Sequence, residues 1–125
     1  MKLTFGCIAL AIFFIFAGAM HFVVPDLYAK IVPPIFPAPF AIVIVSGIAE
    51  ITGGLGLLLP FTRRAAAWGL VLLLICVFPA NIYNAVAHVQ LPGIMAKPWA
   101  QWLRLPFQIP LIWWAWLYTR RPAAL

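Results

Sequence analysis

Acidic side chains are almost absent from this sequence: among 125 residues only Asp26 and Glu50 carry a carboxylate. Charged residues make up 8% of the chain and hydrophobic residues 66%. No ordinary soluble domain has this balance, because a soluble surface needs a much larger share of charged side chains. The composition therefore excludes a typical soluble domain and predicts an integral membrane protein, with residues 1–125 forming one domain.

Cysteine pairs and catalytic motifs are also missing. The two cysteines, Cys7 and Cys76, do not form a Cys-x-x-Cys motif, so a thiol–disulfide active site has no local signature. Their expected depths in the membrane differ by roughly 10 Å, which disfavours a disulfide between them. No nucleophile-plus-base motif, phosphate-binding loop or dinucleotide fingerprint is present. The sequence leaves open whether the protein is an enzyme.

Four long apolar runs are present, and each is long enough to cross a bilayer as a helix of about 20 residues. Lys2 and the segment Ala17-Gly18-Ala19 resemble a signal peptide, but the first run stays apolar beyond Ala19, so we expect a retained helix. The predicted fold is all-α, a polytopic bundle of four transmembrane helices that span about residues 3–24, 40–60, 65–88 and 98–119.

Basic residues give the chain a net charge of +6, which in a soluble protein can indicate nucleic-acid binding. Here most of them flank the apolar runs, so we interpret them as topology signals and expect the lipid bilayer, not nucleic acid, as the partner. The N-terminus, the loop near residue 63 and the C-terminal tail hold five Lys and Arg residues, whereas the other two loops hold two. Both termini are therefore predicted to be cytoplasmic.

A proline-rich loop from Pro25 to Pro39 follows the first predicted span. Its five prolines exclude a long helix, while its apolar residues suit the membrane interface or a cover over the bundle. The spacing of His21, Pro25 and Lys30 recurs at His88, Pro92 and Lys97. This recurrence favours two similar hairpins related by an axis along the membrane normal.

Glu50 is the only acidic residue in any of the apolar runs. An ionised carboxylate at the centre of a bilayer costs several kcal/mol, so it must be paired, protonated or in contact with a wet cavity. Ser46 and Gly54 share its helical face at offsets of four residues, and small residues let another helix approach closely. We therefore expect Glu50 to point into a helix–helix interface.

Other polar residues lie in the outer half of the predicted bundle, from roughly 5 to 15 Å below its surface. The long Arg104 side chain is expected to reach Glu50 and to form an ion pair with it. This layer is interpreted either as a structural clamp or as a functional pocket or proton path. No spacing typical of metal ligands occurs, so no metal site is predicted. The polar cluster consists of His21, Glu50, Asn81, Asn84, His88, Arg104 and Gln108.

Five segments of the chain together resemble the DoxX-like family of small bacterial membrane proteins. They are Ala17-Gly18-Ala19-Met20-His21-Phe22, Ser46-Gly47-Ile48-Ala49-Glu50-Ile51-Thr52-Gly53-Gly54-Leu55-Gly56-Leu57-Leu58-Leu59-Pro60, Thr62-Arg63-Arg64, Pro79-Ala80-Asn81-Ile82-Tyr83 and Arg104-Leu105-Pro106-Phe107-Gln108. The resemblance implies a four-helix membrane bundle in the bacterial inner membrane. It also implies a link to quinone- or thiol-dependent redox systems, to protein assembly or to cargo handling.

Three functions remain open from these observations. The first is a small-molecule-binding or accessory component of a membrane redox system, with a quinone as the candidate ligand beside Glu50 and Arg104. The second is a small-solute or proton-coupled carrier, although the inner half of the bundle lacks polar side chains. The third is an assembly partner for another membrane protein, or a homo-oligomer, without catalysis.

Overall fold

Helices are the only regular secondary structure in the part of the chain that the structure describes. The structure is a computed structural model, and it describes residues 3–30, 32–87 and 97–120. The expected all-α fold is confirmed, and each predicted span corresponds to one long helix, with ends shifted by no more than two residues. The helices of the described residues are α1 (Phe5–Val23), α2 (Pro25–Ala29), α3 (Pro39–Leu58), α4 (Arg63–Ala87) and α5 (Pro98–Leu117).

Three of these helices are long and apolar enough to cross a membrane: α1, α3 and the Arg63–Tyr83 part of α4. The α5 helix also has 20 residues, but Arg104, two glutamines and internal prolines make its mean hydropathy lower. The described chain therefore contains three apolar helices of membrane length and a fourth, more polar helix of similar length.

Local sequence signals set where the helices begin and end. The side chain of Thr4 caps α1, because its Oγ1 accepts a hydrogen bond of 3.2 Å from the backbone N–H of Cys7. Proline stands in the first turn of both α3 and α5, where a missing N–H costs nothing. Pro79 lies inside α4, yet the helix continues through it to Ala87.

The helices α1 and α3 approach each other closely because glycines lie at their contact. A Cβ atom on Gly18 would lie 2.7 Å from the carbonyl oxygen of Gly47, and one on Gly54 would lie 2.8 Å from that of Ala11. Such backbone-to-backbone contact is typical of membrane helices with small residues at their interface. Gly54 therefore packs as its spacing predicts, whereas Ser46 lines a cavity instead.

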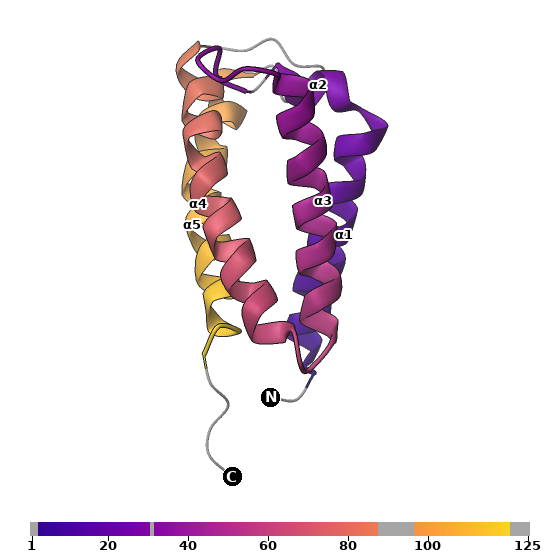
Figure 1. Cartoon of the computed structure of the whole chain (residues 1–125). Helices are drawn as coiled ribbons and strands as arrows, with labels where there is room; N and C mark the ends of the chain where they lie inside the picture. The colour runs from indigo at the N-terminus through magenta and orange to yellow at the C-terminus, as the bar shows by residue number, and fades with distance from the viewer. Residues whose placement is uncertain (1–2, 31, 88–96, 121–125) are drawn as a thin grey trace.

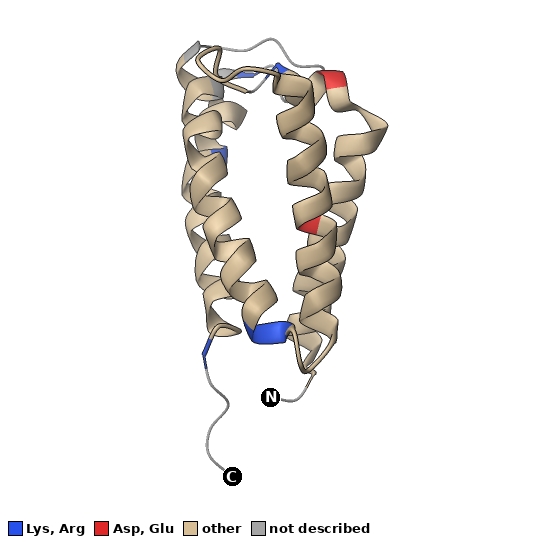
Figure 2. Ribbon diagram, in the orientation of Figure 1, with Lys and Arg blue, Asp and Glu red and all other residues tan. Residues whose placement is uncertain are grey.

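The four long helices form two pairs (Figure 1). The pair α1 and α3 lies on one side, the pair α4 and α5 on the other, and α3 also packs on α4. The short α2 and the loop that follows it lie at the opposite end from the α3–α4 turn. The helix α1 begins and α5 ends at the same end as that turn, where basic residues also gather (Figure 2).

The hydrophobic core occupies the end near the α3–α4 turn. Its buried residues come from α1, α3, α4 and α5, including Leu10, Leu57, Leu70 and Ala115. Arg63 is also buried there, and its Nε donates a hydrogen bond of 2.7 Å to the carbonyl oxygen of Leu57. This bond satisfies a carbonyl at the end of α3 that has no partner within the helix. The core closes this end of the bundle.

Candidate functional site

A cavity of about 760 Å³ occupies the opposite half of the bundle, towards α2. All four long helices contribute to its wall, as do Tyr28 in α2 and three residues of the loop after it. The proline-rich loop thus covers the cavity, in line with one of the two places expected for it. Most of the lining is apolar; its titratable or amide side chains are His21, Tyr28, Glu50, Cys76, Asn81, Arg104 and Gln108.

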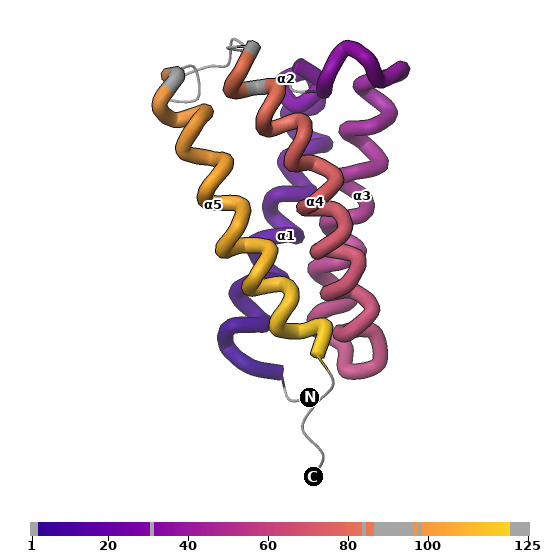
Figure 3. Tube along the Cα trace, turned by 90° about the vertical axis from the view of Figure 1, so that its left-hand side faces the viewer, coloured from indigo at the N-terminus to yellow at the C-terminus, as the bar shows by residue number. Residues whose placement is uncertain are grey.

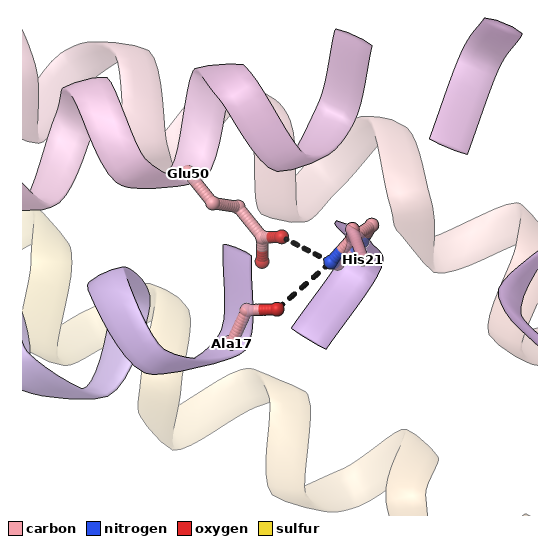
Figure 4. Close-up of polar contacts among 3 residues, drawn as sticks. All are labelled: Ala17, His21 and Glu50. Carbon is pink, nitrogen blue, oxygen red and sulfur yellow. Dashed lines mark hydrogen bonds and ion pairs between the residues drawn. The ribbon is translucent and has the colours of Figure 1, made fainter. Parts of the chain in front are cut away.

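Glu50 on α3 is paired with His21 on α1 (Figure 4). Its Oε2 lies 3.2 Å from His21 Nδ1, and only 15% and 13% of the two side chains are exposed. The same nitrogen lies 2.8 Å from the carbonyl oxygen of Ala17, one turn earlier in α1. Close packing at Gly47 permits this pairing, because a Cβ there would lie 2.8 Å from the Cβ of His21.

The geometry around His21 leaves part of the Glu50 carboxyl without an aligned hydrogen bond. A carbonyl oxygen only accepts, so we infer that Nδ1 carries a proton and donates it to Ala17. That proton is directed towards the closer oxygen, and Glu50 Oε2 makes no aligned hydrogen bond within the described residues. Glu50 is thus held beside the ring but keeps acceptor capacity for another group.

Tyr28 belongs to the same side of the cavity. Its ring stacks on the imidazole of His21, with ring centroids 4.1 Å apart and an angle of 18° between the planes. Burial raises the pKa of the Tyr28 phenol, and the charge of Glu50 raises it further while Arg104 lowers it. The phenol therefore stays protonated near neutral pH and is available as a hydrogen-bond donor.

A chain of hydrogen bonds lies across the cavity, on α4 and α5. Arg104 Nη2 donates to Asn81 Oδ1 at 3.3 Å, Asn81 Nδ2 donates to Gln108 Oε1, and Gln108 Nε2 donates to the carbonyl oxygen of Leu74. Each amide is therefore used as both acceptor and donor, which fixes its orientation. Arg104 Nη1 is buried and has no hydrogen-bond partner among the residues described.

The prediction that Glu50 and Arg104 form an ion pair is wrong. Within the described chain, Glu50 pairs with His21 and Arg104 with Asn81, so the two charged groups line one cavity without meeting. Sequence spacing could give the depth of each residue but not which helices are neighbours. Because α1 packs directly on α3, the residue that lies next to Glu50 is His21, on α1.

The structure brings five residues of the predicted polar cluster to this cavity: His21, Glu50, Asn81, Arg104 and Gln108. The side chain of Asn84 and the whole of His88 lie outside the described parts of the chain, so the proposed repeat around His21 and His88 stays a prediction. Sequence reasoning missed Tyr28, because only the turn from α1 into α2 brings it back over His21.

The arrangement suits binding more than covalent chemistry. Both cysteines are free: Cys7 is buried in the core, while Cys76 is exposed and lines the cavity. Among the described residues, no three His, Cys, Asp or Glu side chains come together as metal ligands would. What the cavity offers is an acceptor at Glu50, donors at Arg104 and Tyr28, and apolar walls between them.

Comparison with known proteins adds a family but no activity. No curated protein and no solved structure matches the chain. A family model described as a domain of unknown function (DUF8561) matches residues 10–119, which include every residue that lines the cavity. The chain therefore belongs to the DUF8561 family.

Proposed function

We propose that this membrane protein binds a small amphipathic molecule in the cavity between its two helix pairs. The observation that carries the proposal is a pair of buried polar atoms, Glu50 Oε2 and Arg104 Nη1, that lack hydrogen-bond partners among the described residues. Both residues line the same largely apolar cavity. Leaving a buried polar group unsatisfied costs about 1–3 kcal/mol, and more if it is charged, so a ligand that satisfies both groups would be stabilised.

The polar groups define what the head of the ligand must offer. It needs an acceptor for Arg104 and Tyr28 and, on its far side, a donor for Glu50. A quinol has hydroxyl groups on opposite sides of a flat ring, so the oxygen of one accepts from Arg104 and Tyr28 while the other hydroxyl donates to Glu50. The oxidised quinone offers two acceptors and lacks the donor, so the reduced form fits the site better. The cavity, at about 760 Å³, falls within the range of roughly 300–1,000 Å³ that small-molecule sites occupy.

The wider role follows from the resemblance to the DoxX-like family. We propose an accessory component of a membrane redox system, which presents a quinone to a partner protein in the bacterial inner membrane. The apolar core at the end near Leu57 argues against a carrier, since it offers no polar path beyond the cavity. Electron transfer by this chain itself is not part of the proposal.

The same proposal includes four membrane spans and cytoplasmic termini. The α5 helix supports the fourth span, because it packs along α4 and contributes four residues to the cavity wall. Its polar residues Arg104 and Gln108 face that cavity, so they do not require contact with lipid. Basic residues at the end where α1 begins favour a cytoplasmic location for that end.

A binding measurement tests the function. The purified protein in lipid nanodiscs is titrated with a hydroquinone that carries a decyl chain and is kept reduced, and binding is followed by calorimetry. We expect Glu50→Gln and Arg104→Gln each to weaken binding about tenfold, which corresponds to about 1.4 kcal/mol. Asp26→Asn and Arg120→Gln remove exposed charges outside the cavity and serve as matched controls. Absence of binding by the wild type, or equal losses in the controls, would reject the proposal.

A further inference from the structure

A second, smaller cavity lies beside the first, between α1 and α5. It has a volume of about 380 Å³, half that of the main cavity, and is lined by Phe13, Phe107, Pro110, Leu111 and Trp114. Phe13, Phe107 and Leu111 also line the main cavity, so the two spaces share a wall. We call this smaller cavity the α1–α5 groove.

The groove exists because α1 and α5 diverge. At the closed end of the bundle the side chain of Tyr118, the residue after α5, reaches α1, since a Cβ on Gly6 would lie 2.7 Å from the Tyr118 hydroxyl. Towards the Pro98 end of α5 the two helices separate, as both views of the bundle agree (Figures 1 and 3). The helices α3 and α4 also lie farther apart towards α2 than at their turn, and the main cavity lies between the two helix pairs there (Figure 1).

The lining of the groove is apolar and partly open to the membrane. Phe107 is 66% exposed and Phe13 is 46% exposed, and no charged side chain lines the groove. A polar or charged ligand would lose its hydrogen bonds to water in such a place without gaining others. A hydrocarbon chain loses nothing there, because lipid tails and apolar side chains are equivalent surroundings for it.

We infer that the α1–α5 groove is a lateral opening that holds the hydrocarbon tail of the cavity's ligand. The inference rests on the proposed function and adds that the ligand carries one linear hydrocarbon chain and reaches the site from the bilayer. The head lies between Glu50 and Arg104, and the tail passes Phe13 and Phe107 into the lipid. The shared wall of the two cavities supplies the continuity that this path needs.

The occupant of the groove can be located by photo-crosslinking. The intact protein in nanodiscs is exposed to a hydroquinone whose alkyl chain ends in a diazirine, and adducts are mapped by mass spectrometry. We expect adducts at the groove residues, and excess tail-less hydroquinone should remove them because both heads compete for the cavity. Adducts that are equally frequent at the lipid-facing Phe16 and Ile109 and that resist competition would overturn the inference.

A filled groove supplies the second test. Pro110 lines the groove but not the cavity, whereas Pro106, one turn earlier in α5, lines neither, so Pro106→Trp is a matched control for Pro110→Trp. We expect Pro110→Trp to weaken binding of the decyl-hydroquinone at least tenfold and to leave tail-less hydroquinone binding unchanged. Retained binding of the tail-less compound also shows that the variant is folded.

The outcomes separate this inference from the proposed function. If neither compound binds the wild type, the proposed function fails. If both bind and Pro110→Trp affects them equally, or if competed adducts lie at the loop residues Val32 and Phe36, the ligand sits in the cavity but its tail leaves by another route.

Discussion

The carboxyl of Glu50 lies 3.2 Å from the imidazole of His21, and this contact joins the middle of α3 to the last turns of α1. It places the one acid of α3 beside a group that can carry positive charge, in a part of the bundle with little solvent exposure. Arg104, the other charged group of the cavity, is held across from it by Asn81. The site is therefore divided between two helix pairs.

The contact predicts energetic coupling between Glu50 and His21. We expect Glu50→Gln and His21→Phe each to destabilise the protein, and the double variant to lose less than the sum, with a coupling of about 0.5–3 kcal/mol. Phenylalanine keeps the stacking on Tyr28 while removing Nδ1. Unfolding by titration with sodium dodecyl sulfate, followed by circular dichroism, measures these losses.

A matched cycle with Arg104→Gln distinguishes the two candidate partners of Glu50. Because Arg104 contacts Asn81 and not the carboxyl, its coupling to Glu50 should be smaller than that of His21. A larger coupling with Arg104 than with His21 would contradict the arrangement of the cavity described above.

The glycine contact between α1 and α3 predicts that adding a methyl group at Gly47 destabilises the protein. In Gly47→Ala the new Cβ would lie 2.8 Å from the Cβ of His21 and 3.0 Å from the carbonyl oxygen of Gly18, so α1 must shift. We expect a loss of about 1–3 kcal/mol, measured by the same unfolding titration. Gly69→Ala in α4 is the control, because nothing lies within 4 Å of its Cβ, and it should be neutral or stabilising. Equal effects of the two changes would show that α1 and α3 do not pack through Gly47.

The buried Arg63 predicts that the α3–α4 turn depends on one side chain. Its Nε and Nη2 donate to the carbonyl oxygens of Leu57 and Leu58, at 2.7 and 3.4 Å. Arg63→Met keeps much of the apolar stem but removes these donors, and should lower the free energy of unfolding by about 1.5–3 kcal/mol. Lys30→Met removes an exposed charge and should change it little. A neutral Arg63→Met would mean that other donors satisfy these carbonyls equally well, either water or, at Leu57, the Cys7 Sγ that already donates to it at 3.4 Å.

The proposed topology predicts which cysteines react from outside the cell. The exposed Cys76 is first removed, so that it does not react. One new cysteine at a time is then placed at Lys30 or at Phe61, which lies in the α3–α4 turn and is 94% exposed. A membrane-impermeant maleimide should label position 30 in intact cells and position 61 only after lysis. Labelling of position 61 in intact cells would place the termini outside.

Local sequence signals predicted the helices and part of the cavity. The positions of the helices along the sequence follow from local properties. These are the apolar runs, the prolines at 39 and 98, and the lack of acids other than Glu50 in the runs. Depth along a helix follows too, because the rise per residue is constant. For this reason His21, Glu50, Asn81, Arg104 and Gln108 could be assigned to one layer before the structure was known.

The sequence by itself determined that the chain is all-helical, that its helices have the length of membrane spans, and that polar side chains share one level of the bundle. Only the tertiary structure decided that Glu50 meets His21 instead of Arg104, that Tyr28 folds back over the imidazole, and that α1 and α5 diverge around a groove. The physical reason is that periodicity and hydropathy describe one helix at a time, whereas the choice of partner depends on which helices pack together. Here the glycines at 18, 47 and 54 bring α1 against α3, and that choice sets the distances across the cavity.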